Sequence, residues 1–308
     1  MTYTAQSSSL LLPPSPVDPT VPAPENVPFH RRALINPRHR WWRPIVTILV
    51  SVAVYVVLVL VAIVVAMLTS PELDALLSSE NFDMNRPEVA AATTISLALM
   101  IPSIAIGVRV GERRRLGTMS SIAGRLRVGL LGRYGALALL CTGLSLALAL
   151  VTELIVHPEL TLQPTWSATS LGMLACALLL VPFQAAAEEY AFRALPQQVL
   201  GSWLKSPWWG ILLPIPLFVL GHEYELQGQL AVGFFALAAG ILTWRTGGLE
   251  AAIALHIVNN ALIFALGAIG LADLNATGGS WLGLLIDAAG VTLFCALVLR
   301  HHAKTQLS

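Results

Sequence analysis

The chain has 308 residues, of which 56% are hydrophobic and only 11% are charged, and its formal net charge is +1. Roughly a quarter of the residues of a soluble domain are charged, so this composition excludes an ordinary water-soluble fold. It fits an integral membrane protein, because the bilayer itself solvates the apolar helices that cross it. The net charge itself says little about partners, and no nucleic-acid partner is expected.

Residues 1–42 are rich in serine and proline and lack an apolar period, which predicts a disordered cytoplasmic tail. The first strong apolar run begins near Ile45 and is as long as a full membrane span, so no signal peptide is expected. The three cysteines, Cys141, Cys176 and Cys295, each stand alone in apolar runs. They are predicted to be packed core residues rather than disulfide partners or metal ligands.

Residues 43–304 are predicted to form one all-α membrane domain with about eight transmembrane helices, since each span needs about 20 apolar residues. In chain order, the predicted spans are 45–68, 89–108, 134–151, 171–187, 208–222, 230–244, 249–271 and 281–299.

The distribution of charge predicts the orientation of these spans in the cell membrane. If both termini are cytoplasmic, every Lys and Arg except Arg86 lies on the cytoplasmic side. This agrees with the positive-inside rule. The acidic residues of the first outer loop are Glu72, Asp74, Glu80, Asp83 and Glu88.

A first group of charged residues follows the apolar run of the fourth span. A charge near the middle of a spanning helix costs about 2.5 to 3.5 kcal/mol, so such residues usually have a use. Glu189 and Arg193 are four residues apart and can pair on one helix face. Glu188 points about 100° away from them and remains a candidate base. The alternative is that all three form an interfacial cap of the helix.

Two further polar groups occur in later spans. His222 closes the fifth span, in which Pro214 and Pro216 allow a bend. His256 and Asn260 share one face of the seventh span, with Asn259 beside them. Taken singly, these residues also have structural interpretations, as an interfacial histidine and as hydrogen-bonding groups between helices.

The three groups form an ordered pattern of Glu-Glu-x-x-x-Arg at 188–193, Phe-x-x-x-His at 218–222 and His-x-x-x-Asn at 256–260. This pattern, within residues 183–260, resembles the motif series of the CPBP family (CAAX proteases and bacteriocin-processing enzymes, also called Abi proteins), which includes the type II prenyl endopeptidases. The resemblance implies an intramembrane endopeptidase. Its expected substrate is a membrane-associated protein or peptide, cut near the C-terminus or in a leader.

By the same resemblance, Glu188 and His222 would activate water, while His256 and Asn260 would stabilise the oxyanion. A short fourth span would place Glu188 at the inner face and His222 near the outer one. The two can meet only if the fourth helix continues through Arg193 to about Leu200, so one long helix is predicted there.

The cofactor is left open between none and one zinc ion, for which Glu188, His222 and His256 would be the ligands. Metal-free chemistry is favoured, because Arg193 and Asn260 suit the binding of anions better than that of zinc. Two alternatives to a protease remain: a catalytically silent scaffold or immunity protein, and a proton-coupled transporter.

Three acidic residues have no place in the motif series. Glu223 and Glu225 follow His222 directly and could alter the choice of substrate. Asp287 lies about six residues inside the last span and is expected to be a structural or outer-mouth polar residue rather than a catalyst.

Overall fold

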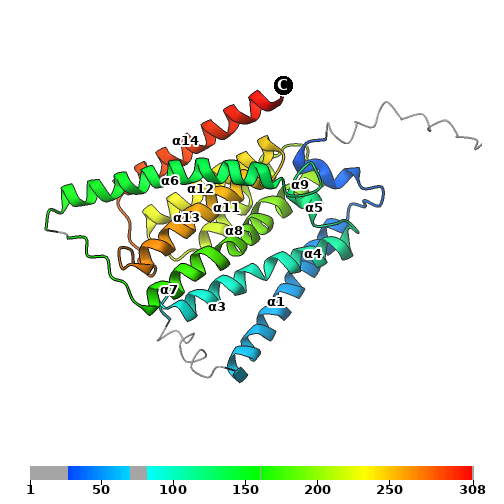
Figure 1. The fold of residues 1–308 in the computed structure, drawn as a ribbon. Coiled ribbons are helices and arrows are strands. Elements are labelled where there is room, and N and C mark those ends of the chain that lie inside the picture. Colours follow the sequence, from blue (N-terminus) through cyan, green and yellow to red (C-terminus); the bar gives the residue numbers. More distant parts are fainter. Residues whose placement is uncertain (1–26, 70–81, 160, 307–308) are drawn as a thin grey trace, which may run out of the picture.

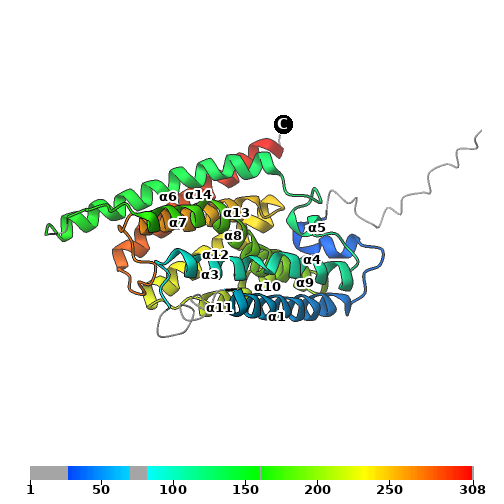
Figure 2. The same ribbon diagram turned by 60° about the horizontal axis from the view of Figure 1, so that its bottom comes forward.

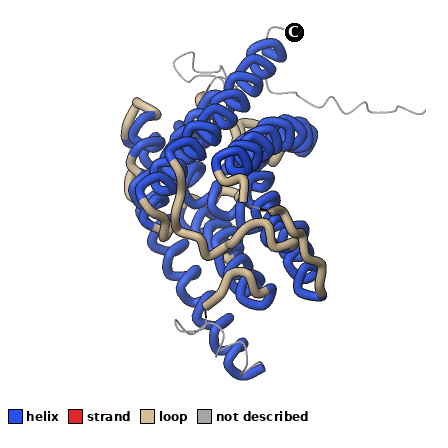
Figure 3. The backbone as a smooth tube through the Cα atoms, turned by 90° about the vertical axis from the view of Figure 1, so that its left-hand side faces the viewer, coloured by secondary structure: helices blue, strands red, loops and turns tan. Residues whose placement is uncertain are grey.

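The computed structural model describes residues 27–69, 82–159 and 161–306, and its elements in these ranges are all helices (Figures 1 and 3). This confirms the all-α prediction. In chain order the elements are η2 (Phe29–Ile35), α1 (Arg43–Thr69), α3 (Pro87–Ala98), α4 (Met100–Gly111), α5 (Gly117–Ser120), α6 (Val128–Val156), α7 (Ala168–Ala175), η3 (Cys176–Leu180), α8 (Val181–Glu189), η4 (Tyr190–Ala194), α9 (Leu195–Trp203), α10 (Trp208–Leu212), α11 (Pro214–Leu220), α12 (Leu226–Thr246), α13 (Glu250–Ala268) and α14 (Trp281–Gln306).

Seven helices of the described residues are long and apolar enough to cross a membrane, so the chain is a multi-pass membrane protein. They are Arg43–Thr69, Pro87–Gly111, Val128–Val156, Ala168–Trp203, Leu226–Thr246, Glu250–Ala268 and Trp281–Thr305.

The fifth predicted span differs from the prediction, because residues 208–222 contain only the shorter apolar stretch Trp208–Leu220. This stretch is about 20 Å long, less than the hydrocarbon core of a bilayer. It is divided into α10 and α11, and α11 begins at Pro214, which lacks the amide hydrogen needed to continue the preceding helix.

The fourth span is the long helix that the sequence predicts, running without interruption from Ala168 to Trp203 over 36 residues. Its start is fixed by a capping box between Ser167 and Ser170. Two π turns, η3 and η4, precede α8 and α9, each of which has a proline in its first turn. A π turn shifts the hydrogen bonding by one residue, which accommodates a proline without ending the helix.

Helix α1 lies on the opposite side of the molecule from α6 and α14 (Figures 1 and 2). It packs against α4, where a Cβ atom at Gly107 or Gly111 would collide with Ser51 or Thr47. Glycines spaced four apart allow such close approach of two membrane helices. On the other side of the bundle, α13 packs against α6, α7, α8 and α12.

Part of the predicted disordered tail is helical. In η2, Phe29 and Ala33 lie one turn apart and are buried, and the Nε2 atom of His30 is 3.0 Å from the backbone oxygen of Lys205. The composition of residues 1–42 does not show this short apolar repeat, so the prediction is wrong for residues 29–35. The remainder of the tail up to residue 26 lies outside the described residues, as do Glu72, Asp74 and Glu80 of the acidic loop.

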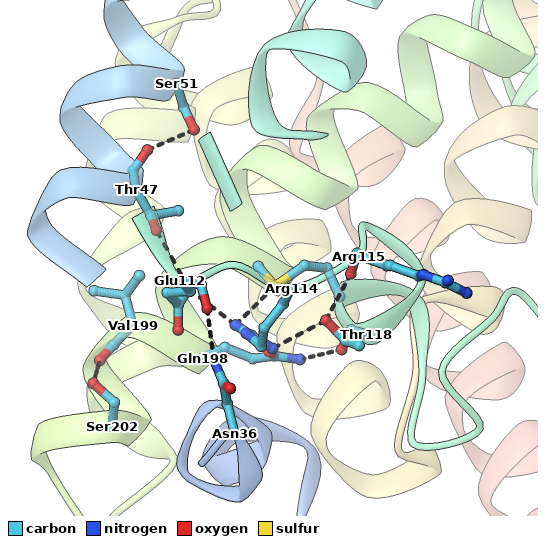
Figure 4. Close-up of polar contacts among 11 residues, drawn as sticks. Asn36, Thr47, Ser51, Glu112, Arg114, Arg115, Thr118, Gln198, Val199 and Ser202 are labelled. Atoms are coloured by element: carbon cyan, nitrogen blue, oxygen red, sulfur yellow. Dashed lines mark hydrogen bonds and ion pairs between the residues drawn. The ribbon is translucent and has the colours of Figure 1, made fainter. Parts of the chain in front are cut away.

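A buried ion pair that the sequence analysis does not identify lies directly after α4. The Arg114 guanidinium lies 3.0 Å from Glu112 and donates a 2.8 Å hydrogen bond to Gln198 of α9 (Figure 4). Asn36 donates to the backbone oxygen of Glu112 at 2.6 Å (Figure 4). The cluster therefore ties the N-terminal segment, α4 and α9 together.

A second pair holds the start of α13. Glu250 is fully buried and binds the Arg127 guanidinium through both carboxylate oxygens, at 3.0 and 2.7 Å. The three cysteines are free thiols, as predicted, with Cys141 and Cys176 buried and Cys295 half-buried.

Candidate active site

The centre of the candidate site is the carboxylate of Glu189, at the end of α8. Its Oε1 atom lies 3.1 Å from the Arg193 guanidinium and accepts a 2.7 Å hydrogen bond from Nδ1 of His256 on α13. The side chain of Glu189 is fully buried and that of Arg193 is 2% exposed. The ion pair predicted from the spacing of Glu189 and Arg193 is present, and His256 joins it from another span.

Glu188 points away from this pair. Its Oε1 atom accepts a 2.6 Å hydrogen bond from Gln184, one turn earlier on the same helix. Its Oε2 atom is buried without a hydrogen-bond partner among the described residues and lies 3.6 Å from Nε2 of His256. One carboxylate oxygen is thus fixed, and the other stands beside an imidazole nitrogen.

The partners of the two histidines determine where their protons lie. Nδ1 of His256 faces a carboxylate, and Nδ1 of His222 faces the backbone oxygen of Phe218 at 2.8 Å. A carboxylate or carbonyl oxygen can only accept, so each Nδ1 atom carries a hydrogen. The Nε2 atoms are not engaged by these partners, and that of His256 lies beside Glu188.

Phe218 connects the charged residues with both histidines. Its ring lies 4.1 Å from the guanidinium carbon of Arg193, which favours the cation there. The same ring packs against His222 and His256, at centroid distances of 4.8 and 6.3 Å. Phe235 of α12 packs against Arg193 and His256 from a further side, and no signal in the sequence indicates it.

Asn260 reaches Glu188 through an intermediate residue. Its side-chain amide donates a 3.1 Å hydrogen bond to Gln184, which in turn donates to Glu188. The sequence analysis does not identify Gln184, although a polar residue four positions before Glu188 in an apolar run is a usable signal. Asn259 donates to Asn260 at 3.3 Å.

A cavity of about 270 Å³ lies in front of these residues. Its polar lining consists of His222, Tyr224, His256, Asn259, Asn260 and Asp287. Tyr224 and Gly278 place its mouth at the end of the bundle where α11 connects to α12 and α13 to α14. Glu188 and Glu189 are not part of the lining, so they lie behind the imidazole of His256.

The structure does not bring together every residue that the sequence groups. His222 shares the cavity with His256, but among the described residues no hydrogen bond or ion pair joins it to Glu188, whereas Nε2 of His256 lies 3.6 Å from that carboxylate. Within residues 27–69, 82–159 and 161–306, no three His, Cys, Asp or Glu side chains gather as metal ligands. The proposed zinc set of Glu188, His222 and His256 therefore does not fit a metal ion as these residues lie.

The bundle and its buried Glu-His-Arg cluster define a polytopic membrane protein with a candidate hydrolytic site. Residues 168–262 match the family described as "Type II CAAX prenyl endopeptidase Rce1-like". This match confirms the resemblance to the CPBP family, and at the level of the family it supports a CAAX-type intramembrane protease.

The chain is also 26% identical over 238 residues to the uncharacterized protein YyaK of Bacillus subtilis (strain 168). The alignment covers 72% of this chain and 76% of that protein. No solved structure matches the chain.

Proposed function

We propose that the protein is an intramembrane endopeptidase that hydrolyses a peptide bond of a membrane-associated protein or peptide, near its C-terminus or in a leader. One observation carries this proposal: the unpaired Oε2 atom of Glu188 lies 3.6 Å from the imidazole of His256, which forms part of the cavity wall. A proton acceptor thus lies directly behind an imidazole that faces the cavity.

In this proposal the Oε2 atom of Glu188 takes a proton from water, and the water oxygen attacks the carbonyl carbon of the peptide bond. The Nε2 atom of His222 accepts a hydrogen bond from the second hydrogen of the water, which stays on the water oxygen. The negative charge then develops on the carbonyl oxygen. The imidazolium form of His256 donates the hydrogen of its Nε2 atom to that oxygen, while its Nδ1 atom stays hydrogen-bonded to Glu189.

The intermediate collapses when Glu188 returns its proton to the leaving nitrogen. The carbon–nitrogen bond breaks, and the products are a new carboxyl group and a new amine. The hydrogen bond from Asn260 to Gln184 favours a positioning role for Asn260, because it holds Gln184 against the other oxygen of Glu188.

Glu188→Gln tests the proposal, because the amide has nearly the same shape but cannot take a proton from water. Peptides that accumulate in membranes of cells with wild-type protein are compared with those of cells with Glu188→Gln. Glu153→Gln, on the exposed part of α6, is the matched control. We expect the wild-type and control profiles to agree and the Glu188→Gln profile to lack the cleaved products. Identical profiles for all three would refute the protease and favour the silent scaffold.

The metal is tested on the same purified proteins by measuring their zinc content. The proposal expects the wild-type protein to cleave after zinc is removed with a chelator. The wild-type protein could instead hold one zinc ion per chain that His222→Ala loses, and chelation could abolish cleavage. These two results together would refute the metal-free mechanism and support a metal-assisted one.

We further propose that the protein lies in the cell membrane with both termini in the cytoplasm. The support is the accumulation of arginine and lysine in the connections on one side of the spans. Reporter fusions after Glu80 and after Ser308 should then lie on opposite sides of the membrane. Reporters on the same side would contradict this topology.

A further inference from the structure

Asp287 lies in α14, six residues after Trp281, and it lines the same cavity as His222 and His256. No hydrogen bond or ion pair joins its carboxylate to another described residue. A carboxylate inside a spanning helix is costly unless it finds a partner, and it usually faces a water-filled cavity or a pathway for a ligand. The position of Asp287 in the cavity wall therefore calls for a partner that enters from outside.

A side pocket continues from the cavity at this residue. It has a volume of about 100 Å³ and shares Asn259, Ile263 and Asp287 with the main cavity. Its walls come from α6, α13 and α14 and are mostly apolar, with Leu146 and Ser145 among them. A carboxylate beside apolar walls suits a side chain whose aliphatic stem lies along those walls and whose charged end reaches the carboxylate, as in lysine and arginine.

The charges around the cavity are consistent with such a ligand. Among the described residues that line the cavity and the side pocket, none is Lys or Arg. Glu223 and Glu225 are exposed on either side of Tyr224, which lies at the mouth. Negative charges at the entrance attract cationic groups and raise their local concentration.

We propose that Asp287 is a specificity-determining residue that binds the lysine or arginine side chain of a substrate, close to the peptide bond that is cut. The inference rests on the proposed function, because it places this subsite in the same cavity as the candidate catalytic residues. It assigns Glu223 and Glu225 to the capture of the same cationic segment.

The experiment uses full-length protein in liposomes and pools of random peptides in which one fixed position is lysine, its uncharged analogue norleucine, or glutamate. The measured quantity is the ratio of kcat/KM for the lysine pool to that for the norleucine pool. We expect a wild-type ratio of about 10 or more, which is the preference that one charge-assisted hydrogen bond provides. Asp287→Asn should bring the ratio close to 1, and Asp287→Lys should favour the glutamate pool. Glu153→Gln, which removes one exposed negative charge outside the cavity, should keep the wild-type ratio.

A binding measurement separates this inference from the proposed function. The same pools are titrated against the Glu188→Gln protein, with and without Asp287→Asn, and bound peptide is measured by fluorescence anisotropy. If the lysine pool binds preferentially through Asp287 but the wild-type protein cleaves nothing, the subsite is supported and the protease is refuted. If the wild-type protein cleaves all pools alike, or Asp287→Asn keeps the preference for lysine, the inference is overturned and the protease remains.

Discussion

The substitution Glu189→Gln removes one charge from the centre of the candidate site with almost no change in shape. In the wild-type protein, Oε1 of Glu189 lies 3.1 Å from Arg193 and 2.7 Å from Nδ1 of His256. The amide oxygen of glutamine can still accept one of these hydrogen bonds. It cannot neutralise the guanidinium, which is 2% exposed and therefore has almost no water to replace the lost carboxylate.

The expected loss of stability follows from these contacts. Removal of one partner from a buried ion pair costs about 3 to 5 kcal/mol, because the other charge is left uncompensated. The ring of Phe218, 4.1 Å from the guanidinium carbon, remains and continues to favour the cation by about 0.5 to 2 kcal/mol. We therefore expect Glu189→Gln to lower the free energy of unfolding by about 3 kcal/mol, at the lower end of the range for buried pairs.

The free energy of unfolding is measured in mixed micelles by titration with denaturing detergent, followed through tryptophan fluorescence. The matched control is the double variant Glu189→Gln/Arg193→Met, which also removes the stranded charge. Its loss should be smaller than the sum of the two single losses by about 1 to 3 kcal/mol. A loss below about 0.5 kcal/mol for Glu189→Gln, the usual effect of a surface substitution, would refute the reasoning.

Three further predictions concern the scaffold. Arg114→Met should lower the free energy of unfolding by about 3 kcal/mol because it strands buried Glu112, whereas Arg115→Met, at an exposed position, should change it by less than about 0.5 kcal/mol. Gly107→Ala should lower the free energy of unfolding by about 1 to 3 kcal/mol, because the added methyl group collides with α1. Gly129→Ala should not lower it, because the added Cβ atom meets no packed neighbour within 4 Å. Equal effects of the two substitutions in the same titration would contradict this packing. Burial lowers the pKa of His30 in the folded protein below its ordinary value of 6.5. Below pH 6.5 the unfolded chain therefore binds more protons at His30 than the folded chain does. The contribution of His30 to stability is present above pH 6.5 and is lost as the pH falls through the folded pKa. The thermal midpoint of the wild-type protein should therefore fall more between about pH 7.5 and 5 than that of His30→Gln, and equal falls would contradict this.

The sequence predicts those parts of the site that depend on one helix alone. The period of the α-helix places Glu189 beside Arg193 and turns Glu188 away from them, and the structure has both features. The long fourth helix is also predicted, because the depth of Glu188 in the membrane requires it. These predictions succeed because residues four apart on a helix are neighbours in any tertiary fold.

Contacts between different helices cannot be predicted from the spacing of residues along one helix. The resemblance to the family pairs Glu188 with His222, whereas His256 is the imidazole beside Glu188 in the structure. Phe235 also enters the site through packing between helices, for which no spacing in the sequence is a guide. The same holds for Arg114, which looks like one more basic residue of a loop until its buried partner is seen.

The shortened fifth span and the candidate site have a common physical cause. Pro214 separates α10 from α11, and α11 ends at Leu220, so this stretch of about 20 Å is shorter than the apolar core of a bilayer. In the proposed topology, the connection after α11 then lies within the membrane on the side away from the basic loops. Tyr224, in that connection, lies at the cavity mouth, and the cavity extends from there to His256. The proposed hydrolysis requires that water pass His256 to Glu188, and a full-length fifth span would place apolar residues where this entrance lies. The deviation from eight full-length helices is thus the feature that opens the cavity in front of His256.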